Sequence, residues 1–105
     1  MQGDNATNEA RDRAKQLMTQ RDELDKRIQT LYDVLTQNNS NMTDPLVDAQ
    51  GYPRADIDVY AVRHARHDII CAQNDRESLT TDIERLLHQI HSQSQPSPVA
   101  GENKQ

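Results

Sequence analysis

Residues 62–90 read VRHARHDIICAQNDRESLTTDIERLLHQI, and apolar side chains recur along them at alternating intervals of three and four. Eight of the nine positions in this row are apolar and one, Arg76, is charged; the row is Val62, Ala65, Ile69, Ala72, Arg76, Leu79, Ile83, Leu86 and Ile90. A spacing that averages about 3.5 residues keeps one seam of an α-helix against a partner helix. The row therefore predicts a long helix, from about Asp56 to His91, that packs on a second helix.

A matching row lies in the first third of the chain, and seven of its eight positions are apolar. It comprises Ala10, Ala14, Leu17, Arg21, Leu24, Ile28, Leu31 and Leu35. This row predicts a helix from about Thr7 to Gln37. Two such seams face each other when the chain folds back on itself, so the expected fold is all-α: an antiparallel two-helix coiled-coil hairpin over residues 7–91.

The segments outside the two seams lack this periodicity. Residues 1–6 are expected to form a flexible N-terminus. Residues 92–105 contain two prolines and a glycine and are expected to be a disordered tail or linker. Residues 38–41 read NNSN, which suits the end of a helix because Asn tolerates the left-handed backbone.

Each row has one polar interruption, Arg21 in the first and Arg76 in the second. If Leu35 lies level with Val62, the two arginines also lie level. One interpretation is that both pack their aliphatic stems in the seam and extend their guanidinium groups into solvent. The other is a polar device that fixes the register or contacts a partner, with the charge neutralised by carboxylates. Four carboxylates lie close enough in sequence to do so: Asp22, Asp25, Asp75 and Glu77.

The connection over residues 38–55 is too long for a simple helical hairpin loop, and we expect it to be ordered. Its apolar residues are Met42, Leu46, Val47 and Tyr52, and they stand among Pro and Gly turn signals. They are expected to fold back and cover the end of the hairpin, because a two-helix core is thin. The segment can also present part of a docking surface, and the two interpretations are compatible.

The composition limits the classes of protein that the chain can form. It has 105 residues, a net charge of −5, no Phe or Trp and 19 Leu, Ile and Val residues. This aliphatic content lies just under the roughly 20% below which composition indicates disorder, so the fold depends on where these residues stand. No apolar run is long enough to cross a membrane, and the N-terminus lacks the apolar core of a signal peptide, so we expect an intracellular protein.

Residues with catalytic or metal-binding chemistry are few. His64 and His67 share one helical face, as do His88 and His91, in the manner of metal ligands. The two pairs stand 24 residues apart, so they cannot share an ion, and neither pair has further ligands nearby. Cys71 has no accompanying groups for nucleophilic catalysis. We expect no metal, no cofactor, no enzymatic activity and, because a basic stripe is lacking, no nucleic-acid binding.

Several side chains outside the seams are candidates for contact with a partner protein. Ile70 and Tyr60 are expected on the outer face of the second helix, close to arginines, a composition typical of protein-binding patches. The candidate partner-binding residues are Tyr60, Arg63, Arg66, His67, Ile70 and Asn74. The alternative is that Ile70 and Tyr60 contact the connecting segment or a second copy of the chain.

The most specific motifs stand in the connecting segment and the second helix. They are MTDPLVD at 42–48, GYPR at 51–54, DIDVY at 56–60, IIC at 69–71 and QND at 73–75. With these motifs in this order, the chain resembles the N-terminal helical domain of the 26S proteasome non-ATPase regulatory subunit 9 family. Ala49 and Ala72 stand at positions where the resemblance leads us to expect Cys and Leu, respectively.

The resemblance implies a chaperone for assembly of the proteasome regulatory particle. Members of the family bind an ATPase subunit of the base, regulatory subunit 6A, and prevent premature contacts until they leave. Their helical domain contacts the ATPase module, while a PDZ domain that follows takes the ATPase's C-terminal tail. This sequence contains no PDZ domain, so only the first contact is carried over. We expect a monomer in the cytoplasm and nucleus; the alternative is a structural coiled coil that forms homo-oligomers.

Overall fold

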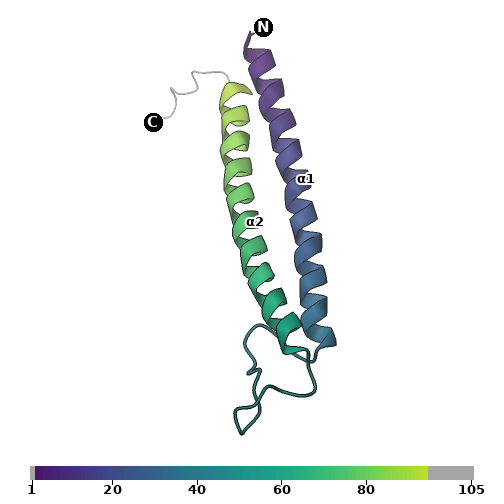
Figure 1. The fold of residues 1–105 in the computed structure, drawn as a ribbon. Helices are drawn as coiled ribbons and strands as arrows, with labels where there is room; N and C mark the ends of the chain where they lie inside the picture. The colour runs from purple at the N-terminus through teal and green to yellow at the C-terminus, as the bar shows by residue number, and fades with distance from the viewer. Residues whose placement is uncertain (1, 95–105) are drawn as a thin grey trace, which may run out of the picture. The chain divides into compact units, whose positions relative to one another are not determined.

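The computed structural model describes residues 2–94, with side chains over residues 5–93. Two helices make up its regular structure, α1 at Gln2–Gln37 and α2 at Val59–Ser94, and they run antiparallel (Figure 1). The predicted all-α helical hairpin is therefore confirmed. Neither helix is long and apolar enough, within the described residues, to cross a membrane.

The helices contribute to two compact units. The terminal unit comprises Met1–Arg21 with Ser78–Gln105, and the loop unit comprises Asp22–Glu77. Both units use the predicted seam: each of its 17 positions, counted over the two rows, is buried or half-buried. The heptad spacing therefore identifies the inward face of both helices.

The terminal unit has a narrow core of small and aliphatic side chains. Ala10, Ala14 and Leu17 of α1 and Ile83 of α2 are buried. Thr7 is also buried, and its Oγ1 donates a hydrogen bond of 2.9 Å to Oε1 of Gln93. Thr7 lies inside α1, which begins at Gln2 rather than near Thr7, so this hydroxyl links the two helices and does not stand at a cap position.

The loop unit has the larger core. Leu35 of α1 forms one buried cluster with Val62, Ala65 and Ile69 of α2, as the predicted register requires. Six partly buried side chains pack against this cluster: Leu31, Tyr32, Val34, Met42, Leu46 and Ile57. The last three belong to the connection between the helices, so this segment closes the end of the hairpin.

The covering role predicted for the connecting segment is correct for Met42 and Leu46 but wrong for Val47 and Tyr52, which are exposed. An isolated antiparallel bridge pairs Val47 with Pro53, and the turn between them uses Gly51 at a φ of 89°. Successive side chains of extended backbone point to opposite sides. Leu46 therefore packs inward and its neighbour Val47 faces solvent.

Hydrogen bonds at the end of α1 fix where the segment begins. Asn39 adopts a φ of 54°, and the Ser40 N–H donates to the Leu35 carbonyl over 2.9 Å. With the Asn39 N–H bonded to the Thr36 carbonyl, this is a Schellman cap. The left-handed backbone expected for an Asn within residues 38–41 thus occurs at Asn39.

Asn38 and Asp58 fix where the segment ends. Oδ1 of Asn38 accepts a hydrogen bond of 3.0 Å from the Asp58 N–H. Oδ1 of Asp58 in turn accepts from the Ala61 N–H over 3.0 Å, which is the geometry of a helix N-cap. This cap explains why α2 begins at Val59 and not at Asp56, the predicted start.

The two seam arginines take separate partners. In the terminal unit, Nη1 of Arg21 donates to Oγ1 of Thr80 over 3.3 Å. In the loop unit, Nε of Arg76 bonds to Oδ1 of Asp25, and this bond with the nearby negative charge raises the pKa of Arg76. Both arginines are half-buried, as the interpretation of packed stems requires. Both guanidinium groups also bond to the opposite helix, Arg76 through Asp25, one of the carboxylates that the alternative interpretation names.

Arg54 stabilises the connecting segment through bonds to other residues of the same segment. Its guanidinium makes a two-pronged bond to the carboxylate of Asp56, with Nη2 at 2.8 Å from Oδ2, and donates to the Pro45 carbonyl over 3.1 Å. The hydrogen bond from Arg54 lowers the pKa of Asp56 and raises that of Arg54. One side chain thus links both strands of the bridged loop.

We predict that Ile69→Ala lowers the free energy of unfolding by about 2–5 kcal/mol, because Ile69 is fully buried and truncation leaves a cavity. Ile70→Ala, the same change at the exposed neighbouring position, should stay within about 0.5 kcal/mol. Urea denaturation followed by circular dichroism measures both. Equal losses in the two variants would contradict the described core.

The Arg54–Asp56 bond has a pH dependence of defined sign. Because the folded pKa of Asp56 is lowered below its ordinary value of 3.8, the bond stabilises the segment above that pH. The stabilisation is lost as the pH falls through the lowered pKa. In an NMR titration we expect the Arg54 Nε–H resonance to move with a midpoint below 3.8. Asp56→Asn should abolish this transition, and a midpoint at or above the ordinary value would contradict the bond.

Candidate functional site

An exposed row of side chains follows one face of α2 within the loop unit. We call it the α2 stripe; it comprises Tyr60, Arg63, His67, Ile70 and Asn74, all exposed. Their spacing of three, four, three and four residues stacks them along one side of the helix. Tyr60 is 73% exposed and Ile70 is 51% exposed, which is high for large apolar side chains. The structure thus brings together five of the six predicted partner-binding residues.

Arg66, the sixth predicted residue, faces the connecting segment. Its Nε donates to the Asn41 carbonyl over 2.8 Å and its Nη2 donates to the Asp44 carbonyl over 2.6 Å. Nη2 also lies 3.5 Å from Oγ of Ser40. Because its donors are directed at the backbone of residues 41–44, Arg66 holds the segment against α2.

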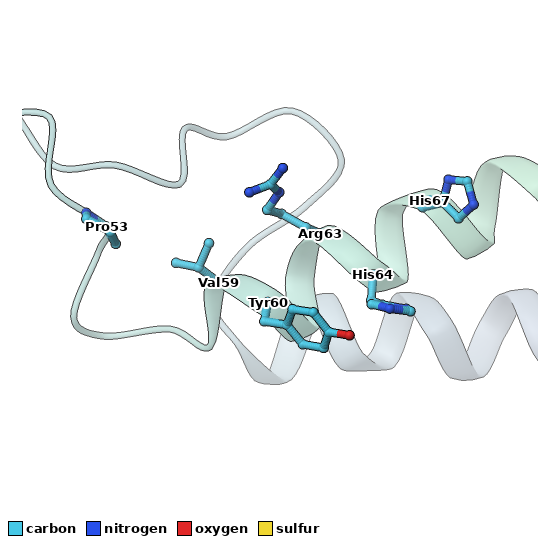
Figure 2. Close-up of a pocket in the computed structure, with 6 residues that line it drawn as sticks. All are labelled: Pro53, Val59, Tyr60, Arg63, His64 and His67. Carbon is cyan, nitrogen blue, oxygen red and sulfur yellow. The ribbon is translucent and has the colours of Figure 1, made fainter.

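An open groove of about 640 Å³ adjoins the N-terminal half of the α2 stripe (Figure 2). Its lining residues are Pro53, Val59, Tyr60, Arg63, His64 and His67. Figure 2 shows Pro53 on the connecting segment opposite Val59 at the first turn of α2. The ring of Tyr60 contacts that of His64, with 4.9 Å between their centroids and 52° between their planes.

Apolar and basic groups share this groove. Pro53, Val59 and the Tyr60 ring supply apolar surface, while Arg63, His64 and His67 supply nitrogen donors. No carboxylate is among the lining residues. Such a surface can pack an apolar side chain and donate hydrogen bonds to an anionic group at the same time.

The donors around the groove differ in how they are engaged. Nδ1 of His64 lies 4.0 Å from Oδ2 of Asp68, a carboxylate oxygen that is also 3.6 Å from Nη2 of Arg27. Nε2 of His67 lies 3.6 Å from Sγ of Cys71. The Arg63 guanidinium makes no hydrogen bond or ion pair with any residue whose side chain is described. Arg63 is therefore the donor most available to an incoming group.

The structure places the histidine and cysteine side chains that were considered for metal binding and catalysis. Over residues 5–93, no group of three or more His, Cys, Asp or Glu side chains is placed to hold a metal ion. Cys71 is a free, exposed thiol on the surface of α2.

Three lining residues of the groove escaped the sequence prediction: Pro53, Val59 and His64. His64 follows Tyr60 by four residues, and that helical spacing alone could have joined the two rings. Pro53 could not have been found in the same way. Its place opposite Val59 depends on the path of the connecting segment, which follows from the bridge to Val47.

Comparison with known proteins identifies relatives of the chain. Residues 14–92 match the model of the Nas2 N-terminal domain family. The chain is 62% identical over 71 residues to a protein of Caenorhabditis elegans named probable 26S proteasome non-ATPase regulatory subunit 9, covering 68% of this chain and 36% of that protein. It is 47% identical over 79 residues to the Homo sapiens protein named 26S proteasome non-ATPase regulatory subunit 9, covering 74% of this chain and 35% of the relative.

A more distant relative carries a related name. The probable 26S proteasome regulatory subunit p27 of Schizosaccharomyces pombe is 38% identical over 81 residues, covering 77% of this chain and 38% of that protein. The chain thus spans little more than a third of the length of these relatives. No solved structure matches it. The family resemblance predicted from the motifs is confirmed.

We predict that Arg66→Ala lowers the free energy of unfolding by about 1–2 kcal/mol, because it leaves backbone carbonyls of residues 41–44 without their charged donor. Arg63→Ala removes the same side chain from an exposed position and should stay within about 0.5 kcal/mol. Urea denaturation compares the two, and amide exchange should quicken over residues 40–44 in Arg66→Ala alone. Equal behaviour of both variants would contradict the anchoring role of Arg66.

Proposed function

The chain belongs to the Nas2 N-terminal domain family, and from that premise we propose that it is a proteasome-associated protein-binding domain. More specifically, we propose an assembly chaperone domain that binds an ATPase subunit of the 19S regulatory particle base. The ATPase that the resemblance indicates is regulatory subunit 6A. Relatives named as 26S proteasome regulatory subunits support the proteasomal role. We propose that the domain acts in the cytoplasm and nucleus.

The observation that carries this proposal is the α2 stripe. Tyr, Arg and large aliphatic side chains account for much of the binding energy at protein interfaces, and here Tyr60, Arg63 and Ile70 lie along one face. Tyr60 and Asn74 stand 14 positions apart, so the stripe is about 21 Å long at roughly 1.5 Å per residue. A length of this order suits a face of a small protein domain.

The connecting segment can extend this surface. A standard interface buries about 800 Å² on each partner, more than five side chains usually provide. Val47 and Tyr52 stand exposed on the bridged loop, in the same unit as the α2 stripe. We propose that Ile70 and Tyr60 form the centre of the contact and that loop residues contribute at its edge.

The proposed mechanism is occlusion by binding. A domain that covers one face of an ATPase subunit blocks other contacts of that face for as long as it stays bound. Release requires that completion of the assembly favours a state of the ATPase for which the domain has lower affinity. This mechanism needs no covalent step and no cofactor, because differences in binding free energy determine both the binding of the domain and its release.

We predict that Ile70→Asp reduces capture of the purified ATPase subunit at least tenfold, because it places a desolvated charge in the proposed contact. Leu87→Asp is the matched control: Leu87 is 44% exposed on α2 but lies in the terminal unit, outside the α2 stripe. It should bind as the unchanged chain does. Circular dichroism must show equal helix content in both variants.

Two outcomes would overturn the proposal. Retained capture by Ile70→Asp would remove the α2 stripe from the contact. Concentration-dependent dimerisation in sedimentation velocity, abolished by Ile70→Asp, would instead favour the alternative of a structural homo-oligomer. The proposed chaperone domain is expected to sediment as a monomer.

A further inference from the structure

We propose that the groove at the start of α2 binds a segment of the protein partner that carries both acidic residues and aliphatic residues such as leucine. A carboxylate of that segment bonds to Arg63, and a neighbouring aliphatic side chain packs against Pro53, Val59 and the Tyr60 ring. The inference rests on the proposed function, since it names the chemistry that the partner presents to this part of the same surface.

Charge complementarity is the first argument. The chain as a whole carries a net charge of −5, yet the groove is lined by Arg63, His64 and His67 and by no carboxylate. The nearby carboxylate of Asp68 lies within ion-pair distance of His64 and Arg27. Arg63 makes no ion pair within the described part of the chain, so its guanidinium group is available to donate two parallel hydrogen bonds to a carboxylate, the strongest geometry of such a pair.

The apolar wall is the second argument. Pro53, Val59 and Tyr60 line the same groove as Arg63 and supply its carbon surface. Figure 2 shows Pro53 and Val59 near each other, with the Arg63 guanidinium and the Tyr60 ring on different sides of α2. A volume of about 640 Å³ lies within the roughly 300–1,000 Å³ typical of binding pockets. A ligand that offers charge alone would leave this carbon surface exposed to water. A peptide with alternating acidic and aliphatic residues can both bond to Arg63 and cover the apolar surface.

The groove is also held in shape before a ligand arrives. Pro53 is fixed by its bridge to Val47, and the neighbouring Arg54 is bonded to Asp56 and to the Pro45 carbonyl. The Tyr60 ring rests on His64. Groups that are already ordered lose little conformational entropy on binding, so a small contact can give measurable affinity.

A nucleic acid fits this groove less well. Binding to a phosphate backbone draws on many basic side chains that release counterions together. Here the groove offers only three basic side chains, Arg63, His64 and His67, and the chain as a whole is acidic. A short peptide needs only one carboxylate contact and one apolar contact, which is what the groove provides.

The test titrates the ¹⁵N-labelled chain with two capped hexapeptides. The probe is acetyl-Asp-Leu-Glu-Asp-Leu-Glu-amide, and its neutral match is acetyl-Asn-Leu-Gln-Asn-Leu-Gln-amide. We expect the acidic peptide to shift the amide resonances of residues 59–67 and to bind at least tenfold more tightly than the neutral one. Arg63→Gln should weaken the acidic peptide at least tenfold. Arg85→Gln, a change at an exposed arginine of the terminal unit, should leave its affinity unchanged.

Several results would overturn the inference: equal binding of the two peptides, equal effects of the two arginine variants, or shifts confined to residues outside the groove. A six-nucleotide single-stranded RNA that shifts the same amides more strongly than the peptide would also overturn it. The test is separable from that of the proposed function. If ATPase capture succeeds and the peptide fails to bind, this inference alone is lost. If the peptide binds through Arg63 and no ATPase is captured, the proposed function is lost.

Discussion

The packing of Leu35 against Val62, Ala65 and Ile69 is the interaction on which the loop unit depends. A two-helix hairpin has no third helix to cover its apolar seam, so burial on this scale is small for a folded domain. The connecting segment supplies the missing cover through Met42, Leu46 and Ile57. The packing of the two helices in this unit therefore depends on the fold of the loop, because loop side chains form part of the core.

Because the core depends on the connecting segment, the arginines of the loop unit have different structural roles. Arg54 and Arg66 direct their donors at carbonyl groups of the connecting segment and keep it folded over the core. Arg76 pairs with Asp25 across the two helices. Arg63 alone among these four has no such bond in the described structure, and it borders the groove. The basic residues that stabilise the fold and the one available for recognition are thus distinguished by their bonding, although they are identical in chemistry.

The sequence predicted those features that depend on local periodicity. The seam positions from Ala10 to Leu35 and from Val62 to Ile90 are buried or half-buried, because heptad spacing directly determines which face of a helix turns inward. The exposure of Ile70 and Tyr60 followed from the same geometry. The contact of Arg66 with the connecting segment could not be predicted in this way, because its acceptors are backbone carbonyls whose position depends on the path of that segment. The start of α2 differs from the predicted one for a related reason. Asp56 and Asp58 are both suitable caps by residue type, but the Asp56 carboxylate binds Arg54, while Asp58 caps the Ala61 N–H and donates its own N–H to Asn38.

Asn38 has a consequence for how the chain could be remodelled. Its amide nitrogen donates to the Val34 carbonyl of α1 over 3.0 Å, and its amide oxygen receives the Asp58 N–H that precedes α2. The two ends of the connection are thereby bonded to one side chain, which holds the ends of the intervening loop together. Lengthening a closed loop costs only about 0.6 kcal/mol for each doubling. The solvent-exposed turn at residues 48–51 is thus a natural position for inserting a peptide tag or a second binding epitope, since the helices are joined beneath it.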